Sequence, residues 1–215
     1  MTLSDPRIIL LAKAPVAGQS KTRLCPPCTP EEAAQLAEAS LRDTCAAMVA
    51  VASATPIAVL EGAPGPWLPP GVAVVAQRRG GLGDRLAGAF HDVGGPALLI
   101  GMDTPQVTPA LLTRCLAALA RPSVDAVLGL ADDGGFWAIG FRRPIGGAFD
   151  GVSMSADDTG TQQMQRLVAL GLRVGGLPAL RDVDTIADAE VVAAQIPQSH
   201  FACTLARLES RAVVA

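Results

Sequence analysis

Three basic residues lie close together, directly after the first apolar segment of the chain. Lys13, Lys21 and Arg23 fall within eleven residues, and Gly18 lies between them. Backbone N–H groups of a glycine-containing loop can wrap a phosphate while lysine and arginine neutralise its charge. A P-loop is excluded, because that motif needs a glycine immediately before its Lys-Thr pair. The segment is therefore either a phosphate-binding loop or a solvated basic loop.

An acidic residue follows another apolar segment. Asp103 comes shortly after the run Ala97–Ile100 and before Pro105. Mg²⁺ and Mn²⁺ prefer carboxylate oxygens and keep coordination positions for phosphate and water. The alternative is a turn aspartate that accepts backbone N–H groups ahead of the proline. Because ligands of open α/β sheets bind beyond the carboxyl ends of the strands, we favour a metal-binding role for Asp103.

Two further acidic segments have simple structural interpretations as well. Asp132 and Asp133 precede two glycines, and on their own they indicate a tight turn. In a site, such carboxylates can accept hydrogen bonds from hydroxyl groups, and one of them can act as a base, since adjacent like charges raise each other's pKa. Asp182 and Asp184 suggest metal ligands by their spacing, but we expect Asp184 to cap the helix Thr185–Gln195.

Two smaller motifs also have alternatives. The segment Gly80–Leu86 can place a helix N-terminus against an anion, or it is a flexible turn into a helix. Cys25 and Cys28 form a single CxxC motif without a second pair or a nearby histidine, which argues against a zinc site. We interpret them as bystander thiols, and the five cysteines of the chain as reduced.

Short apolar runs alternate with longer helical patterns along the chain, which predicts an open, largely parallel sheet covered by helices on both faces. The predicted strands are Arg7–Ala12, Ile57–Leu60, Val72–Ala76, Ala97–Ile100, Val124–Leu130, Phe136–Phe141 and Leu172–Gly175. The predicted helices are Glu31–Ser53, Gly83–Val93, Pro109–Ala120, Asp157–Leu170, Thr185–Gln195 and Ser199–Val213. The segment Gly62–Gly71, which contains Trp67, is expected to be a surface loop. We expect one domain over residues 1–215, with residues 199–215 as a C-terminal helical extension.

Composition narrows the class of protein. The 215 residues are 50% hydrophobic and 17% charged, which excludes a disordered chain. The 17 Lys and Arg against 20 Asp and Glu give a net charge of −3, without the positive excess of a nucleic-acid-binding protein. Aromatic residues make up 3% of the chain and argue against a base-stacking platform. The apolar run that ends at Lys13 falls short of the roughly 20 residues of a membrane span. A cytoplasmic location is therefore expected.

Five segments together resemble one bacterial family of short GT-A-type glycosyltransferase-like proteins, some described as arsenosugar-biosynthesis glycosyltransferases. They follow the order of that family: Leu11–Leu24, Gly83–Leu86, Gly101–Pro105, Asp133–Trp137 and Asp182–Thr185. The resemblance covers about residues 7–195 and implies the Rossmann-like nucleotide-diphospho-sugar transferase fold, a mixed, mostly parallel sheet flanked by helices. The first and last segments also resemble phospholactate and molybdenum-cofactor guanylyltransferases, which share that fold.

The resemblance implies a role for each matching residue. It implies catalytic roles for Lys21, Asp103 and Asp133. The implied nucleotide-phosphate residues are Lys13, Gly18, Lys21, Thr22, Arg23, Gly83, Asp84 and Arg85. The implied acceptor-side residues are Asp132, Asp133, Gly134 and Gly135, and the implied metal ligands are Asp103, Asp182 and Asp184. The chain departs from the family at Cys25–Cys28, which replaces an Ala/Leu/Gly-rich segment, and at Met154, where a tryptophan is expected.

These observations predict a transferase that uses an activated nucleotide together with Mg²⁺ or Mn²⁺. The first hypothesis is glycosyl transfer from a nucleotide sugar to a small acceptor, which the whole-chain resemblance favours. The alternative is a nucleotidyltransferase that joins a nucleoside triphosphate to a phosphate-bearing small molecule and releases pyrophosphate. The basic loop favours this alternative, since a triphosphate carries more charge. A third hypothesis is a nucleotide-binding module without catalysis.

Overall fold

The computed structural model describes residues 3–212 of the chain. Within them, seven strands form one sheet in the order β3-β2-β1-β4-β6-β5-β7. The strands are β1 (Arg7–Lys13), β2 (Thr55–Glu61), β3 (Ala73–Ala76), β4 (Ala97–Ile100), β5 (Ala126–Leu130), β6 (Phe136–Phe141) and β7 (Val174–Gly176). Only β6 runs antiparallel to its neighbours, β4 and β5. The predicted α/β class with a mixed, mostly parallel sheet is confirmed.

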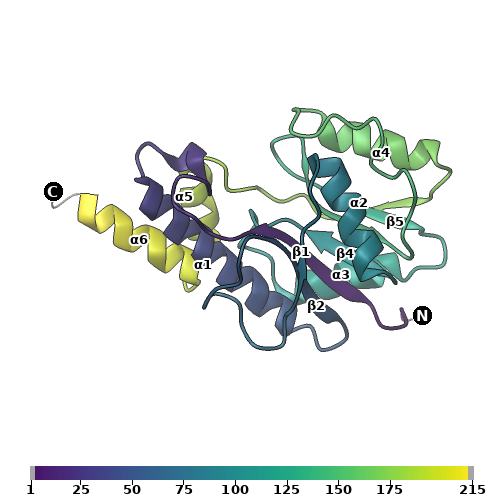
Figure 1. The fold of residues 1–215 in the computed structure, drawn as a ribbon, viewed down its shortest axis with the longest axis horizontal. Helices are drawn as coiled ribbons and strands as arrows, with labels where there is room; N and C mark the ends of the chain where they lie inside the picture. Colours follow the sequence, from purple (N-terminus) through teal and green to yellow (C-terminus); the bar gives the residue numbers. More distant parts are fainter. Residues whose placement is uncertain (1–2, 213–215) are drawn as a thin grey trace.

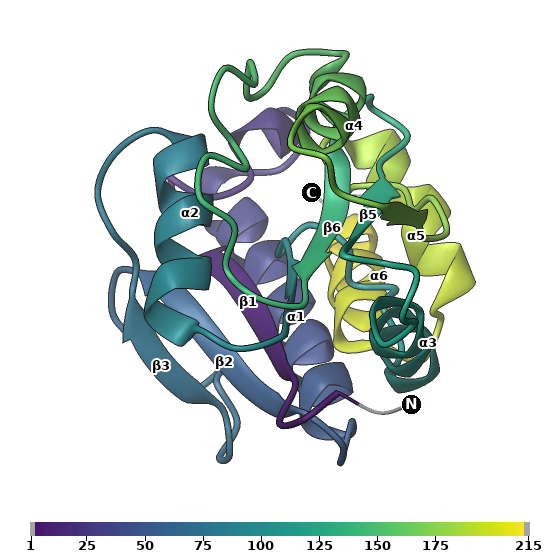
Figure 2. The same cartoon turned by 90° about the vertical axis from the view of Figure 1, so that its right-hand side faces the viewer.

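Helices cover both faces of this sheet (Figure 2). The helices are α1 (Pro30–Val49), α2 (Leu82–Val93), α3 (Pro109–Leu119), α4 (Thr159–Ala169), α5 (Ile186–Gln195) and α6 (His200–Ala212), with a short 3₁₀ helix at Thr22–Leu24. Alternate residues of β1 face opposite sides, as in any strand. Ile8 and Leu10 pack in a buried cluster with α1 and α3, whereas Ile9 packs in a second cluster with α2.

The two C-terminal helices pack against α1, beside the end of the sheet (Figure 1). Phe201 and Leu205 of α6 are buried there with Leu36 of α1. The Asp43 carboxylate accepts the backbone N–H groups of His200, at 3.0 Å, and Phe201, at 2.8 Å. The helix predicted over Ser199–Val213 thus corresponds to α6, although Val213 lies outside the described residues.

Two predictions from local sequence were wrong in the N-terminal half of the chain. The helix predicted to run to Ser53 ends at Val49, because the N–H of Val51 turns back to the Met48 carbonyl at 3.1 Å and the Val51 side chain packs into the core. Trp67, expected in a surface loop, is 3% exposed and belongs to the same buried cluster. A Pro- and Gly-rich segment predicts a loop, but it does not predict where an aromatic side chain within that loop packs.

No helix within residues 3–212 is long and apolar enough to span a membrane.

Candidate functional site

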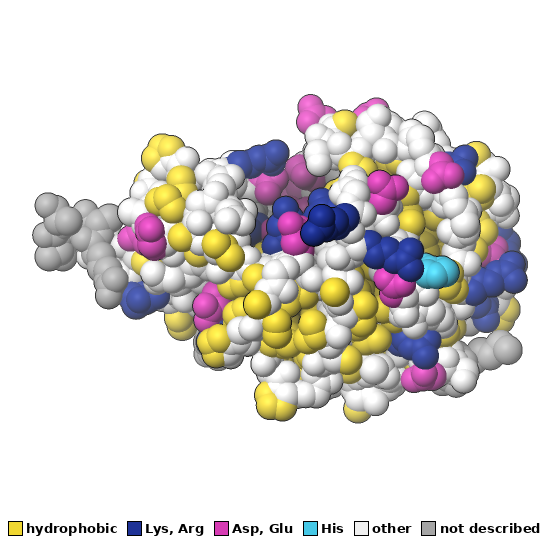
Figure 3. Space-filling view, in the orientation of Figure 1, with side chains coloured by type: hydrophobic (Ala, Val, Ile, Leu, Met, Phe, Trp, Pro, Cys, Tyr) yellow, Lys and Arg dark blue, Asp and Glu magenta, His cyan; other side chains and the backbone are white. Residues whose placement is uncertain are grey.

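The loops that follow β1 and β4 open onto one cavity of about 580 Å³. These strands are parallel neighbours in the sheet, so the loops leave its carboxyl edge side by side. The charged residues that line the cavity are Lys13, Lys21, Arg23, Arg85, Asp103, Asp133, Asp157, Asp182 and Asp184. Basic and acidic side chains meet near the middle of the face drawn in Figure 3. The structure therefore brings together residues that are up to 171 positions apart in the sequence.

Lys21 joins three segments at the floor of this cavity. Its ammonium contacts the Asp103 carboxylate and donates a hydrogen bond to the Val183 carbonyl. The Lys21 side chain is only 6% exposed, whereas Asp103 is 42% exposed and opens to the cavity. Because a buried ammonium is costly without a counter-charge, the Asp103 carboxylate is what allows Lys21 to lie inside the protein.

The backbone around Asp103 is held from two sides. The Ser40 hydroxyl of α1 donates to the Met102 carbonyl at 2.7 Å. On the other side, the Asp103 carbonyl accepts the N–H of Val183 at 2.9 Å. The loop after β4 is thereby tied both to α1 and to the segment before α5, which places Asp103 and Asp182 at the same cavity.

Asp182 is a buried carboxylate. Its Oδ1 atom has no hydrogen-bond partner among the described residues. Burial, and then the negative charges of Asp103 and Asp133, raise the pKa of the Asp182 carboxyl to about 7, while the charge of Lys21 opposes this rise. A buried carboxylate oxygen without a donor is suited to receive a cation or a hydrogen-bond donor from a ligand.

The prediction that Asp184 caps the following helix is wrong. Thr185 is the N-cap of α5: its hydroxyl accepts the N–H of Asp188 at 3.3 Å, and the Asp188 carboxylate accepts the N–H of Thr185 at 3.0 Å. This capping box satisfies the helix start without Asp184. The Asp184 carboxylate instead accepts a hydrogen bond from Arg23 at 2.8 Å. The acidic residue next to a helix is thus part of the cavity.

A second set of charges lies at the ends of β2 and β3. The Glu61 carboxylate lies 3.4 Å from the Lys13 ammonium and 3.0 Å from the Arg85 guanidinium. Arg85 also donates to the Gln77 side-chain oxygen at 2.9 Å. Sequence reasoning missed Gln77, which lines the cavity, and Glu61, which does not line it but pairs with Lys13 and Arg85; both directly follow predicted strands. The rule that sites lie beyond the carboxyl ends of strands, applied to these strands too, would have found them.

The turn between β5 and β6 contributes Asp133 and Gly135 to the cavity. The Asp133 carboxylate accepts the N–H of Gly135 at 2.8 Å, which orients it. Between them, Gly134 has a φ of +89°, and a Cβ at this position would lie 1.7 Å from the Asp157 carbonyl oxygen. Glycine is therefore required here both by the backbone conformation and by the close approach of the next segment.

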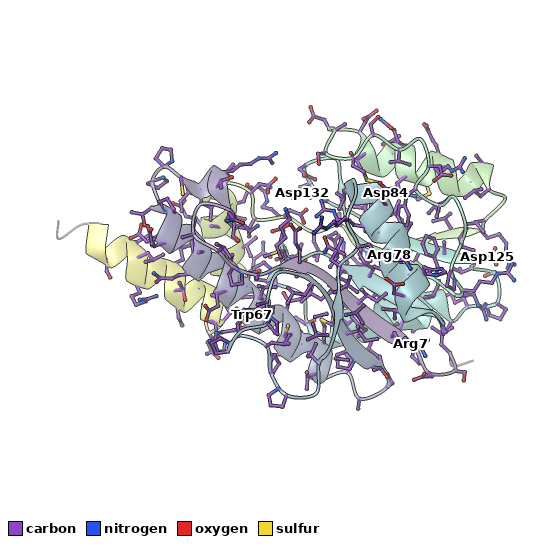
Figure 4. The ribbon with its side chains drawn as sticks, in the orientation of Figure 1. Arg7, Trp67, Arg78, Asp84, Asp125 and Asp132 are labelled. Carbon is purple, nitrogen blue, oxygen red and sulfur yellow. The ribbon has the colours of Figure 1, made fainter. Side chains whose placement is uncertain are left out.

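Not every predicted residue lines the cavity. Those among the described residues that do not are Gly18, Gly83, Asp84, Asp132 and Gly134, whereas Thr22 does. Asp84 accepts the N–H of Gly81 at 3.0 Å and so stabilises the start of α2 (Figure 4). Asp132 lies 3.3 Å from the Arg181 guanidinium. The start of α2 therefore accounts for Asp84, and the ion pair with Arg181 accounts for Asp132.

Met154 and the three residues after it form a wall of the cavity that the sequence analysis did not assign to the site. The helix predicted from Asp157 begins two residues later, at Thr159. The Thr159 hydroxyl donates to the Ser153 carbonyl and accepts the N–H of Ala156, at 2.7 Å and 2.9 Å. These bonds keep the preceding segment as a turn that faces the cavity.

Cys25 and Cys28 are free thiols, each partly exposed. Burial is the main cause that raises the pKa of the Cys28 thiol, and the charge of Glu32 adds to it. A raised pKa reduces the fraction of reactive thiolate.

Of the three predicted metal ligands, Asp103, Asp182 and Asp184, only two are placed so that they could bind a divalent cation. Within residues 3–212, no three His, Cys, Asp or Glu side chains form a cluster that could hold a metal ion, so the three predicted ligands are not gathered into a ready site. Asp184 is engaged by Arg23. Asp103 and the unpartnered oxygen of Asp182 remain, and Mg²⁺ is commonly held by one or two carboxylates together with substrate phosphates. These two residues fit that pattern.

Comparison with known proteins places the chain in a family and a fold. A search of curated proteins finds no match. The most similar solved structures include one from Desulfovibrio desulfuricans G20, provisionally named a nucleotide-diphospho-sugar transferase, with 28% identity, a TM-score of 0.83, and 98% of this chain and 96% of that one covered.

Two nucleotidyltransferases share the fold at lower similarity. CMP:2-keto-3-deoxy-manno-octonic acid synthetase, solved in complex with CTP, has 14% identity and a TM-score of 0.56, with 91% of this chain and 99% of that one covered. The 2-C-methyl-D-erythritol 4-phosphate cytidylyltransferase of Thermus thermophilus has 18% identity and a TM-score of 0.54, with 90% and 98% covered. These matches confirm the predicted nucleotide-diphospho-sugar transferase fold. A family profile matches residues 35–156, more than half of the chain, and the protein therefore belongs to DUF2064, described as an uncharacterized protein conserved in bacteria.

Proposed function

We propose that this protein is a metal-dependent transferase that moves a glycosyl group from a nucleotide sugar to a small acceptor. The observation that carries the proposal is the contact between Lys21 and Asp103, which unites the basic loop and the acidic residues at one cavity. The 28% identity to a protein provisionally named as such a transferase supports it, as does the fold.

Basic residues of the cavity would bind the diphosphate of the donor. Arg23 is 71% exposed and Lys13 is 52% exposed, so both can turn toward a ligand. Hydrogen bonds from lysine and arginine to phosphate are charge-assisted and short. They also stabilise the negative charge that develops on the diphosphate as it leaves, which is the largest contribution to many group transfers.

Asp103 and Asp182 would hold Mg²⁺ or Mn²⁺. When bound, the ion supplies positive charge to the diphosphate leaving group.

Asp133 is the candidate base for the acceptor. Its carboxylate is oriented by the Gly135 N–H and lines the cavity. In the proposed reaction the acceptor oxygen forms a bond to the anomeric carbon while the bond from that carbon to the β-phosphate oxygen breaks. The nucleoside diphosphate leaves with the electron pair, and the proton of the acceptor hydroxyl passes to Asp133.

Nucleotidyl transfer is a second candidate. Four cations line the cavity, Lys13, Lys21, Arg23 and Arg85, and this number suits the larger charge of a triphosphate. In that reaction a phosphate oxygen of the acceptor attacks the α-phosphate, and pyrophosphate leaves. The same basic residues would stabilise this leaving group.

A ligand panel with product analysis tests the proposal. Thermal unfolding is measured with nucleotide sugars and nucleoside triphosphates, each with Mg²⁺, with Mn²⁺ or with EDTA. At a fixed concentration, a ligand with a lower dissociation constant raises the unfolding temperature more. The stabilising donors are then incubated with candidate acceptors. Release of nucleoside diphosphate supports glycosyl transfer, whereas release of pyrophosphate supports nucleotidyl transfer.

Two aspartate variants provide the control. Asp103→Asn is expected to abolish turnover, whereas Asp150→Asn, at a 79% exposed side chain outside the cavity, is expected to keep it. Ligand binding without turnover in the unmodified protein, for every acceptor tried, would instead favour a nucleotide-binding module without catalysis.

A further inference from the structure

Lys21 and Lys13 are the only lysines in the 215-residue sequence, and both line the cavity. They differ in their partners. Lys13 is 52% exposed and lies 3.4 Å from Glu61. Lys21 is 6% exposed, and its ammonium contacts the carboxylate of Asp103 and the carbonyl of Val183. Only one of the two ammonium groups is therefore held by a residue that would also bind a divalent cation.

The carboxylates around Lys21 repel one another. Asp103, Asp133, Asp182 and Asp184 all line the cavity with Lys21, and the Lys21 ammonium contacts the Asp103 carboxylate. If the ammonium moved away, Asp184 would keep Arg23, but Asp103 would lose its ion-pair partner beside the unpartnered oxygen of Asp182, which is unfavourable. A divalent cation bound at Asp103 in place of the ammonium would restore the compensating positive charge.

We propose that the Lys21 ammonium and a divalent cation compete for Asp103, and that the phosphates of the nucleotide draw Lys21 away and so make metal and nucleotide binding mutually dependent. This inference rests on the proposed function, because it requires both ligands at this cavity.

The position and type of the residue support such an exchange. Lysine carries its charge on a flexible stem of four methylene groups and binds phosphate as a point charge. Thr22 and Arg23, the next residues in the chain, line the same cavity, so a phosphate bound there lies beside Lys21. The bonds that Lys21 makes in the protein are one ion pair and one carbonyl contact, which a phosphate can replace.

Coupling between two ligands is reciprocal. If the nucleotide strengthens metal binding by displacing Lys21, the metal strengthens nucleotide binding by the same factor, which is typically about 5–150-fold in coupled systems. Removal of the ammonium should therefore do part of what the nucleotide does. Lys21→Met is expected to bind a divalent ion more tightly than the unmodified protein when no nucleotide is present.

Titration with Mn²⁺, followed by the paramagnetic resonance signal of the free ion, tests this without any measurement of activity. We expect Lys21→Met to bind Mn²⁺ at least about fivefold more tightly than the unmodified protein. Lys13→Met is the matched control, since it removes the same charge from the same cavity but from Glu61 rather than Asp103. It should tighten Mn²⁺ binding less than Lys21→Met does. Asp103→Asn should weaken Mn²⁺ binding both in the unmodified protein and in Lys21→Met.

Several results would overturn the exchange: equal or weaker Mn²⁺ binding by Lys21→Met, the same gain in Lys13→Met, or no Mn²⁺ binding by any of these proteins. Circular dichroism checks that the variants are folded. If Lys21→Met is not, Lys21→Gln, which can still donate to the Val183 carbonyl, is titrated instead. A further outcome is that the unmodified protein transfers a glycosyl group from a nucleotide sugar while the Lys21 variants show no tighter Mn²⁺ binding. In that case the exchange at Asp103 is wrong, and the proposed function still holds. If the unmodified protein binds no nucleotide, the proposed function fails, and the coupling fails with it.

Discussion

Arg23 and Asp184 form an ion pair of 2.8 Å although 161 positions separate them in the sequence. The pair connects the basic loop after β1 to the segment before α5, and both residues line the cavity. Exposed ion pairs of this kind contribute only about 0–1 kcal/mol to stability. Its significance is therefore in where it places the Arg23 guanidinium, rather than in the free energy of unfolding.

Arg23→Gln should weaken the binding of a nucleoside diphosphate about tenfold, because a charged hydrogen bond to phosphate contributes on the order of 1.5–3 kcal/mol. The unfolding temperature should change little. Isothermal titration with the diphosphate of the preferred nucleotide, in the presence of Mg²⁺, measures the effect. Asp184→Asn breaks the same ion pair but leaves the Arg23 guanidinium in place. The affinity of this variant for the nucleoside diphosphate should therefore not fall. An equal loss in both variants would mean that the pair acts only by holding the two segments together.

Lys13 should react with amine acylating reagents faster than Lys21, since its side chain is 52% exposed and that of Lys21 only 6%. Because the chain has no other lysine, peptide mass spectrometry can follow each site separately. A bound nucleoside diphosphate should slow acylation of Lys13. Unchanged labelling at saturating nucleotide would exclude Lys13 from the phosphate site, and acylation of the unfolded chain gives the reference rates.

Asp125→Asn should lower the unfolding temperature by about 2 °C at pH 7. Hydrogen bonds from the Arg173 side chain and backbone, at 2.8–3.0 Å, hold the pKa of the Asp125 carboxyl well below its usual range. A lowered pKa means that the ionised carboxylate is favoured in the folded protein, so its stabilisation is present above about pH 4 and lost as the pH falls below that value. The difference between the two proteins should therefore shrink from pH 5 to pH 2. A difference that grew toward low pH would contradict this assignment.

Gly134→Ala should destabilise the protein by about 2 kcal/mol or more. The added Cβ would lie 1.7 Å from the Asp157 carbonyl oxygen, on a backbone with a φ of +89°. Urea unfolding measures the change. Gly146→Ala is the control, because a Cβ there meets no atom within 4 Å. If both variants unfold at the same urea concentration, the turn between β5 and β6 is not held as described.

Cys45 and Cys115 should resist alkylation in the folded protein. Burial raises the pKa of the Cys45 thiol to about 12 and that of Cys115 to about 11, and the thiolate is the reactive form. Cys203 is exposed. Iodoacetamide at pH 8 should modify Cys203 well before either buried thiol, whereas all should react in urea. Comparable rates for Cys45 and Cys203 without urea would show that α1 opens readily.

Local sequence patterns alone predict where most of the strands and helices lie. The strands predicted over Ala97–Ile100 and Phe136–Phe141 have the bounds that the structure shows, because short apolar runs with flanking Gly, Pro and acidic residues carry this information locally. The general rule for sheets predicted that Asp103 lies beyond a carboxyl end of the sheet, and the structure has it lining the cavity there. The resemblance to known motifs predicted the fold, which the structural comparison confirms. Phosphate binding by the loop after β1 stays a prediction.

Which of these residues come into contact depends on how the strands and loops are arranged in space. The position of β1 between β2 and β4 brings Lys13 and Lys21 to their acidic partners, and strand order depends on long-range packing that no local pattern encodes. Two neighbouring residues, Asp184 and Thr185, could each cap α5. Thr185 is the N-cap because it forms a capping box with Asp188, so Asp184 is available to pair with Arg23. The burial of Asp182 likewise depends on three segments converging around it, so its raised pKa appears only in the folded molecule.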